Sequence, residues 1–250
     1  MNIKKIYRVH FESIDSTHLW AKNHLNELNQ EGITCITADT QTQGQGRFHR
    51  KWHSPKGNLY LSLFFTLPKE SKIFVHIRQI LCFSLAMVLK NWGFAPTLKW
   101  PNDLLLCDKK VSGVLTEIIS IDSKVGVLTG IGVNVNLSEK ELPPINQAAT
   151  SLAIISGKNW DIEKLLNQLT QEFCTNLLIL EKEGFAPFYP TYNALLAWKE
   201  KEVICDDGKQ KIQGICKGIA EDGSLKLLLP DQTLLTMHTG DLQKTLRYCP

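Results

Sequence analysis

The pattern of apolar and polar positions predicts an alternation of strands and helices in the first half of the chain. Helical spacing predicts an amphipathic helix that carries Leu28 and ends at Gly32, and a long buried helix over residues 72–92. Short polar turns between consecutive strands favour antiparallel pairing. Apolar residues at every second position predict strands over residues 6–11, 33–38, 58–65, 97–106, 111–120 and 124–137.

The second half of the chain predicts two helices followed by a different kind of unit. Asp161 is expected to cap a long helix that ends at Gly184, and a shorter helical segment finishes near Trp198. After "AWKEKEV", five short alternating runs are separated by Asp-Gly, Pro-Asp and single Gly turns. We therefore predict an α+β protein with one large unit over residues 1–198 and a small β-barrel over residues 199–250.

The composition indicates a soluble, cytoplasmic protein. Lys and Arg total 28 against 25 Asp and Glu, and this net charge of +3 is too small to imply a dominant nucleic-acid or membrane field. The seven cysteines form no C-x-x-C pair, which favours a reducing compartment without structural disulfides or cysteine-bound zinc. The N-terminus lacks the apolar core of a signal peptide, and no stretch is expected to approach the length of a membrane span.

A glycine-rich stretch, "QTQGQGRFHRKWHSP" at residues 41–55, carries unpaired cations. No acidic residue occurs from Thr40 to Lys69, so the charge of Arg47 and Arg50 is not neutralised within the segment. Gly44 and Gly46 allow close approach of the backbone to a ligand, and an arginine after them can bind carboxylate or phosphate with two hydrogen bonds. The alternative is a solvated loop that is merely basic, and the stretch alone does not decide between the two.

A second stretch, "KWPNDLLLCDKKVSGVLTE", places polar side chains at the ends of strands. Pro101 forces a bend that presents Asn102 and Asp103 at the start of a strand. Lys110 is expected in a turn opposite them, and Gly113 leaves a bare position in the next strand. The alternatives are ordinary turn chemistry for the Asn-Asp pair and an exposed hairpin tip for the lysines.

A third stretch, "GIGVNVN", repeats the bare strand face. Gly130 and Gly132 are two residues apart and therefore lie on one face, and Asn134 projects an amide from an otherwise aliphatic strand. The alternative is a bulge or an edge strand with a surface asparagine. The three alternatives do not explain why the three stretches occur together.

Together with "DST" at residues 15–17, these stretches resemble the biotin–protein ligases. The resemblance implies a catalytic domain over residues 1–198, with a mixed, mainly antiparallel sheet related to class II aminoacyl-tRNA synthetases. It also implies an SH3-like barrel over residues 199–250. Biotin and ATP would give biotinyl-5′-adenylate and pyrophosphate, and a lysine of a biotin carboxyl carrier protein would then take the biotinyl group. The alternatives are a lipoate or octanoyl transferase of the same fold and a non-enzymatic binding module.

The resemblance also implies roles for individual residues. Arg47 and Lys110 would be catalytic, with Lys110 between the carboxylate and the phosphate, and Asp103 would contact Mg²⁺. The biotin contacts would come from Ser16, Thr17, Gln41, Gly44, Gln45, Gly46, Arg47 and Lys110, over a floor of Gly113, Leu115, Gly130 and Gly132. The ATP and adenylate contacts would come from Arg50, Trp52, Asn102, Asp103, Lys110 and Asn134.

Two positions depart from the family pattern, and the same pattern sets which partners are expected. Gln45 stands where an arginine is common, and His49 stands where a glycine is usual. An uncharged Gln45 predicts weaker retention of the adenylate. The glycine-rich loop is expected to order over the intermediate as a lid. No DNA-binding role is expected, because only about ten residues precede the motifs, and a homodimer is compatible with the resemblance.

Overall fold

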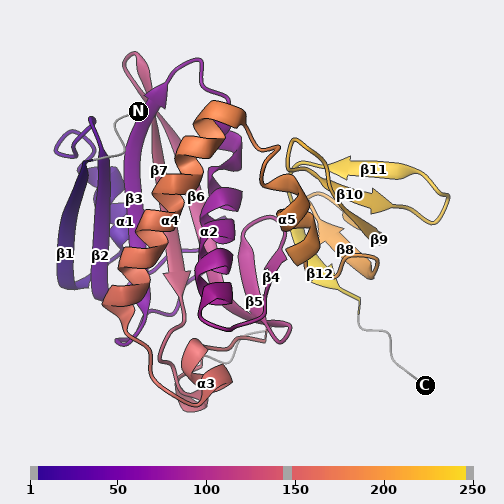
Figure 1. Ribbon diagram of the computed structural model, residues 1–250, viewed down its shortest axis with the longest axis horizontal. Helices are drawn as coiled ribbons and strands as arrows, with labels where there is room; N and C mark the ends of the chain where they lie inside the picture. The colour runs from indigo at the N-terminus through magenta and orange to yellow at the C-terminus, as the bar shows by residue number, and fades with distance from the viewer. Residues whose placement is uncertain (1–4, 143–147, 246–250) are drawn as a thin grey trace.

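The computed structural model describes residues 5–142 and 148–245 and is built around a seven-stranded sheet (Figure 1). The order of its strands is β1-β2-β3-β7-β6-β5-β4, and only β1 and β2 pair in parallel. This confirms the mixed, mainly antiparallel sheet. The strands are β1 (Ile6–Ile14), β2 (Ile33–Gln41), β3 (Leu59–Pro68), β4 (Pro96–Lys99), β5 (Asp103–Leu106), β6 (Lys109–Ile121) and β7 (Lys124–Val133).

Helices cover both faces of this sheet. The long helices α2 (Ile77–Asn91) and α4 (Ile162–Glu183) pack together on one face, and α1 (Thr17–Asn23) packs against β2, β3 and β7 on the other (Figure 1). The remaining helical segments are α3 (Leu152–Ser156), which the sequence pattern did not predict, α5 (Tyr189–Leu195), and the 3₁₀ turns η1 (Arg47–His49), η2 (Ile73–His76) and η3 (Glu139–Glu141).

Helix α1 is shorter than predicted. It ends at Asn23, and His24 forms its C-cap instead of a helix continuing to Gly32. Leu28 is nevertheless buried in the small core beneath α1. The apolar spacing therefore predicted the burial of Leu28 correctly but predicted the wrong conformation for the segment that carries it. The segment "NHLNELNQ" contains three asparagines, which favour turns over helix.

A second sheet lies at the C-terminal end of the chain, beside α5 (Figure 1). Its order is β11-β10-β9-β8-β12, and all its neighbours are antiparallel. One of its contacts with the main sheet unit is through Gly223 O, which accepts from Trp100 Nε1 at 3.0 Å and from Gln79 Nε2 at 2.8 Å. The strands are β8 (Glu202–Asp206), β9 (Lys211–Ile219), β10 (Leu225–Leu228), β11 (Leu234–Met237) and β12 (Asp241–Lys244).

One apolar segment contradicts an expectation from the sequence. Residues Ile73–Asn91 are long and apolar enough to cross a membrane, so the prediction that no stretch approaches that length is wrong. In the structure, most of α2 is buried in the main core between the sheet and α4. Its apolarity therefore matches its place as a core helix. Six cysteines are free thiols, and Cys249 lies outside the described residues.

Candidate active site

A strip of glycines forms a bare floor on the face of the sheet that carries α1. Gly113 pairs with Gly132, and Gly130 pairs with both Leu115 and Ser62, so these positions point to one side of three adjacent strands. Side chains from elsewhere lie directly on this backbone. A Cβ atom at Gly130 would meet His18 Nδ1 at 3.0 Å, one at Gly132 would meet the Trp52 indole, and one at Gly113 would meet Lys110 Nζ at 3.1 Å.

The end of the floor near Gly130 is lined by neutral polar groups. Thr17 donates to Gln41 Oε1 from its backbone nitrogen at 2.9 Å and from its hydroxyl at 3.2 Å. The same hydroxyl lies 2.9 Å from Ser62 Oγ, and Gln41 Nε2 donates to Ser54 Oγ at 3.0 Å. Ser16 is the N-cap of α1, where its hydroxyl accepts from the amide of Leu19. These bonds fix a set of donors and acceptors suited to a small polar ring.

The end near Gly113 carries alternating charges. Lys110 Nζ lies 2.7 Å from Asp103 Oδ1, and buried Lys99 bridges Asp103 at 3.6 Å and Asp241 at 3.2 Å. Arg50 donates to Asp241 at 2.8 Å and completes the row. Burial would raise the pKa of the Asp241 carboxyl, but Lys99 and Arg50 outweigh burial and lower it. Asp241 is therefore the charge that ties the second sheet to this end of the site.

The prediction that Lys110 lies in a turn is wrong, and Lys110 is not an exposed hairpin tip either. The turn is made by Cys107 and Asp108, both at positive φ, and Lys110 belongs to β6. Its backbone is held on both sides, by a bond from its nitrogen to Ala148 O at 2.8 Å and by the Thr150 amide at 2.9 Å. Its ammonium group lies 5.4 Å above the centre of the Trp52 ring.

Arg47 reaches from the glycine-rich loop to the start of β5. Its NH1 donates to Asn102 Oδ1 at 2.9 Å and to Gly240 O at 3.1 Å, which are both neutral acceptors. Burial lowers the pKa of Arg47, and the neighbouring Arg78 adds to this effect. Asn102 is itself anchored by its amide to Val114 O at 2.8 Å. Arg47 thus offers a positive charge that no direct carboxylate contact among the described residues neutralises.

The glycine-rich loop forms a small hairpin. Gly46 N donates to Arg50 O at 2.7 Å, and Trp52 N donates to Gly44 O at 2.8 Å. Gly44 must be glycine, because a Cβ would clash with Trp52 O and the Ser54 hydroxyl. Gly46 has room for a Cβ, whose nearest contact would be Arg50 O at 3.5 Å. Phe48, at φ 57°, is exposed and lies beneath the guanidinium group of Arg47.

The structure brings most of the predicted residues together, and two of them differ. Gln45 is exposed on the loop, where it forms a backbone bridge to Lys51. Asn134 is buried, and its amide donates to Thr150 O at 3.0 Å. That bond joins the residue after β7 to the segment before α3. The position of this amide is therefore explained by local structure, whatever it contacts in addition.

Asp103 does not form a metal site by itself. The two carboxylate oxygens face Lys110 and Lys99, and the described residues contain no group of three His, Cys, Asp or Glu side chains able to hold a metal ion. Mg²⁺ prefers one or two carboxylates together with phosphate oxygens. A contact of Asp103 with Mg²⁺ would require one of its oxygens to leave its lysine, and this contact stays a prediction.

Several site residues escaped the sequence reasoning. Ser62 gave a signal, since it is a lone hydroxyl in the apolar run "NLYLSLFF", and His18 directly follows the Ser-Thr pair. Lys99 precedes the Trp-Pro-Asn-Asp motif and is 4% exposed. Asp241 gave no signal, because it comes from the far end of the chain.

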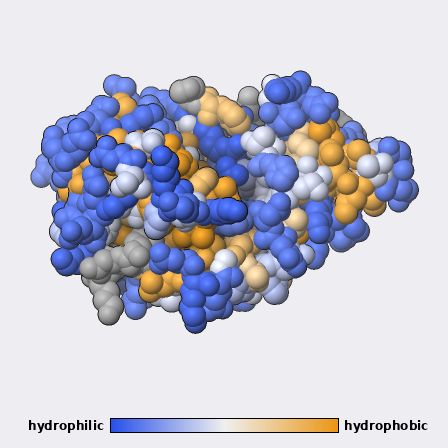
Figure 2. Space-filling view, turned by 90° about the horizontal axis from the view of Figure 1, so that it is seen from above, coloured by the Kyte–Doolittle hydropathy of each residue, from blue (hydrophilic) through white to orange (hydrophobic). Residues whose placement is uncertain are grey.

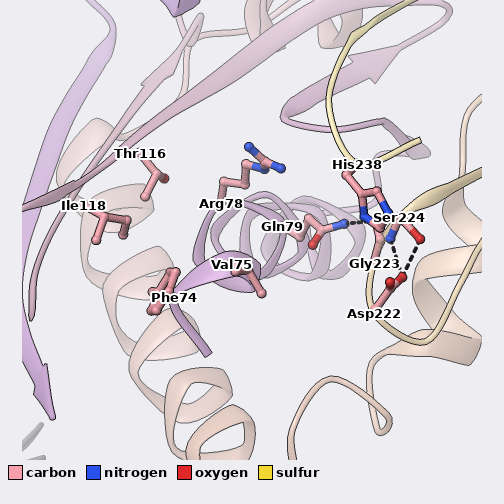
Figure 3. A pocket seen from close by; sticks show the side chains of 10 residues that line it. All are labelled: Phe74, Val75, Arg78, Gln79, Thr116, Ile118, Asp222, Gly223, Ser224 and His238. Atoms are coloured by element: carbon pink, nitrogen blue, oxygen red, sulfur yellow. Dashed lines mark hydrogen bonds between the residues drawn. The ribbon is translucent and has the colours of Figure 1, made fainter. Parts of the chain in front are cut away.

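A separate cavity of about 430 Å³ lies on the opposite face of the sheet, between α2, β6 and the second sheet (Figure 3). Arg78 and Gln79 come from α2, Thr116 and Ile118 from β6, and Asp222 from a turn of the second sheet. Seen from above, the surface between the two sheets is hollowed (Figure 2). None of the residues predicted from the sequence lines this cavity.

Comparison with known proteins gives consistent matches. The sequence model of the Biotin/lipoate A/B protein ligase family matches residues 10–136. The bifunctional ligase/repressor BirA of Escherichia coli is 34% identical over 86% of this chain and 67% of its own length. The biotin–[acetyl-CoA-carboxylase] ligase of Paracoccus denitrificans is 29% identical over 80% of this chain and 85% of its own. The biotin protein ligase of Aquifex aeolicus, solved with biotin and ATP, superposes with a TM-score of 0.83 at 33% identity, covering 96% of this chain and 99% of that one.

Proposed function

The chain belongs to the biotin/lipoate A/B protein ligase family, and we propose that the glycine floor and the charges at its end perform the two half-reactions of a biotin–protein ligase. The enzyme forms biotinyl-5′-adenylate from biotin and ATP and transfers biotin to a protein, as its named relatives and the biotin and ATP complex indicate. The assignment of each step to residues of this chain is our proposal.

The observation that carries the proposal is the polarity of the floor. Biotin has a cyclic urea at one end and a carboxylate at the other. The urea would lie near Gly130, where Thr17, Gln41 and Ser62 supply neutral hydrogen-bonding groups. The carboxylate would lie near Gly113, beneath Lys110. Between them, Gly132 lets the Trp52 indole lie directly against the backbone, so the apolar part of biotin would pack beside this indole.

In the first half-reaction, a carboxylate oxygen of biotin attacks the α-phosphorus of ATP, and the bond from that phosphorus to the β-phosphate oxygen breaks. Negative charge accumulates on the phosphoryl oxygens, and positive groups aimed at that charge lower the barrier. Lys110 would hold the carboxylate and the α-phosphate together. Arg47, held only by neutral acceptors, would stabilise the growing charge. Arg50 and Trp52 would lie beside the nucleotide and contact it.

In the second half-reaction, the neutral amine of a carrier lysine attacks the acyl carbon of the adenylate. The new C–N bond forms as the acyl C–O bond breaks, AMP leaves with its negative charge, and the amine loses a proton to solvent. Lys110 and Arg47 would now stabilise the departing phosphate. Water would hydrolyse the adenylate, so the loop over residues 44–53 would order over it as a lid.

The setting of the reaction completes the proposal. The acceptor would be a biotin carboxyl carrier protein, in the cytoplasm, and no DNA-binding role is part of the account. A homodimer is compatible with it. Mg²⁺ would arrive with the phosphates of ATP rather than through Asp103, whose oxygens face two lysines. Residues 1–198 and 199–250 would be the catalytic and barrel domains, and Asp241 supports a role for the second in the site.

The test is pyrophosphate exchange into ATP, measured with biotin, lipoate, octanoate or no acid. Exchange that requires biotin and is absent with the other two acids supports the proposal. Exchange that is driven by lipoate or octanoate instead would replace biotin as the substrate, because that polar end would then recognise no urea.

A further inference from the structure

We propose that His18 is a specificity-determining residue that accepts a hydrogen bond from a urea N–H of biotin. The inference rests on the proposed function, since it concerns the same floor. His18 is the second residue of helix α1, directly after the N-cap Ser16 and Thr17.

His18 is buried, and its contact with Glu117, 3.5 Å from Nε2, is too long to be a good hydrogen bond. Its residue is 5% exposed, and neither ring nitrogen makes a hydrogen bond to the part of the chain that the structure describes. A buried polar atom left without a bond is costly, so such atoms normally meet another group, water or a ligand. The ring therefore either fills space in the core at a cost in free energy, or it forms a hydrogen bond to a bound molecule.

The surroundings of the ring decide which nitrogen is the acceptor. Nε2 lies 3.5 Å from Glu117 Oε1, and Lys22 holds the other oxygen of Glu117 at 2.7 Å. Burial would raise the pKa of Glu117, but Lys22 and His18 outweigh it and keep the carboxyl ionised. A carboxylate can only accept, so it selects the tautomer with the proton on Nε2. Nδ1 then carries a free lone pair.

That lone pair lies over the floor. Nδ1 is 3.0 Å from the position of a Cβ at Gly130, and Ser62 Oγ is 3.4 Å from the same position. Ser62 Oγ is in turn 2.9 Å from Thr17 Oγ1. An acceptor and two hydroxyls therefore converge above Gly130. A cyclic urea offers two N–H donors and one carbonyl acceptor, which is the complement of this set.

Protonation of the ring would remove the acceptor. Burial lowers the pKa of His18, Lys22 lowers it further, and Glu117 opposes both. These are the charged groups that act on the ring from α1 and β6. The imidazole is therefore neutral at neutral pH, and the KM for biotin should rise only once the pH falls below the ordinary histidine range.

The test compares KM for biotin in pyrophosphate exchange among four proteins. His18→Leu removes the acceptor and should raise KM about tenfold while kcat changes little, since one net hydrogen bond corresponds to about that ratio. His18→Asn places an amide oxygen where Nδ1 was and should stay within about threefold of the parent, without the rise of KM at low pH. His10→Leu, which alters an exposed histidine on β1, is the matched control and should be unchanged.

A second probe separates recognition from folding. The parent should discriminate strongly between biotin and an analogue methylated on a urea nitrogen, and His18→Leu should discriminate less. In ¹⁵N-histidine-labelled parent protein, the Nδ1 resonance of His18 should move when biotin saturates the site, a result that does not depend on any variant. If the parent catalyses biotin-dependent exchange but the Nδ1 signal does not move and KM is unchanged in His18→Leu, this inference is wrong and the function stands. Absence of exchange in the parent would remove both.

Discussion

Replacing Lys110 by arginine keeps its charge but should disable the first half-reaction. The ammonium group has three close neighbours: it lies 2.7 Å from Asp103 Oδ1, 3.1 Å from the position of a Cβ at Gly113 and 5.4 Å from the centre of the Trp52 ring. A guanidinium group is broader and planar. It can still pair with Asp103, but to do so it must move the Trp52 indole or project into the space where the two anions meet.

The expected magnitude follows from the loss of one oriented cation. Removing a single group that stabilises transition-state charge costs about 2.7–4 kcal/mol, or about 100- to 1000-fold in rate. Because the charge of Lys110→Arg is kept and only its position changes, we expect the lower end, about 100-fold in kcat for pyrophosphate exchange. The melting temperature should change little, because the ion pair with Asp103 can re-form.

The assay measures initial rates of biotin-dependent pyrophosphate exchange together with thermal unfolding. Lys109→Arg is the matched control, since Lys109 is exposed, adjacent and on the same strand, and it should behave like the parent. A Lys110→Arg enzyme as fast as the Lys109→Arg enzyme would refute the reasoning, because the position of the ammonium group would then be immaterial.

Three further predictions test other parts of the site. Arg47→Ala should lower the exchange rate by about 100-fold or more, because it removes the cation that Asn102 and Gly240 hold in place, while Arg47→Lys should recover part of the loss; equal rates for the parent and Arg47→Ala would contradict this role. Asp241→Asn should lower the free energy of unfolding at pH 7 by about 1–2 kcal/mol, a value reduced because the carboxyl is partly exposed. Urea titrations should show that the difference in this free energy between the parent and the variant vanishes as the pH falls through the lowered pKa of Asp241, because the parent then loses the same charge. Gln45→Arg should slow the release of biotinyl-5′-adenylate, measured by rapid filtration with labelled adenylate, because it adds a cation to the loop; an unchanged release rate would show that this exposed position does not reach the intermediate.

The order of elements could be predicted because the buried face of each element places apolar residues at regular intervals along the sequence. The strand over 58–65 and the helix from Asp161 to Gly184 follow from that period and from capping residues. The strand predicted over 124–137 ends at Val133, and the segment predicted as one strand over 97–106 is two antiparallel strands, β4 and β5, because the chain turns at residues 100–102. Helix α1 was predicted to be too long, and it shows the limit of prediction from apolar spacing. The same spacing occurs in a helix and in turns that bury the same side chains. The cis peptide bond between Trp100 and Pro101 was likewise not predicted.

The candidate site could be predicted only where its chemistry is local in sequence. Arg47, Asp103 and Lys110 belong to short motifs, and the sequence within each motif indicates a strand, a turn or a loop. Asp241 completes the same charge row from 138 residues beyond Asp103, and this contact depends on the docking of the second sheet. His18 shows a different limit, because only the structure reveals that its ring is buried over Gly130 with no hydrogen-bond partner for Nδ1 among the described residues.

The most direct test of the account is the transfer of labelled biotin to a carrier domain. Purified enzyme is incubated with a biotin carboxyl carrier domain, labelled biotin and ATP, and label bound covalently to the carrier is measured with and without ATP. The account predicts ATP-dependent labelling that is lost when the acceptor lysine of the carrier is replaced by arginine, with AMP and pyrophosphate formed in equal amounts. ATP-independent labelling, or no labelling by a folded enzyme that binds both substrates, would contradict the central claim that this chain joins biotin to a protein lysine through an adenylate.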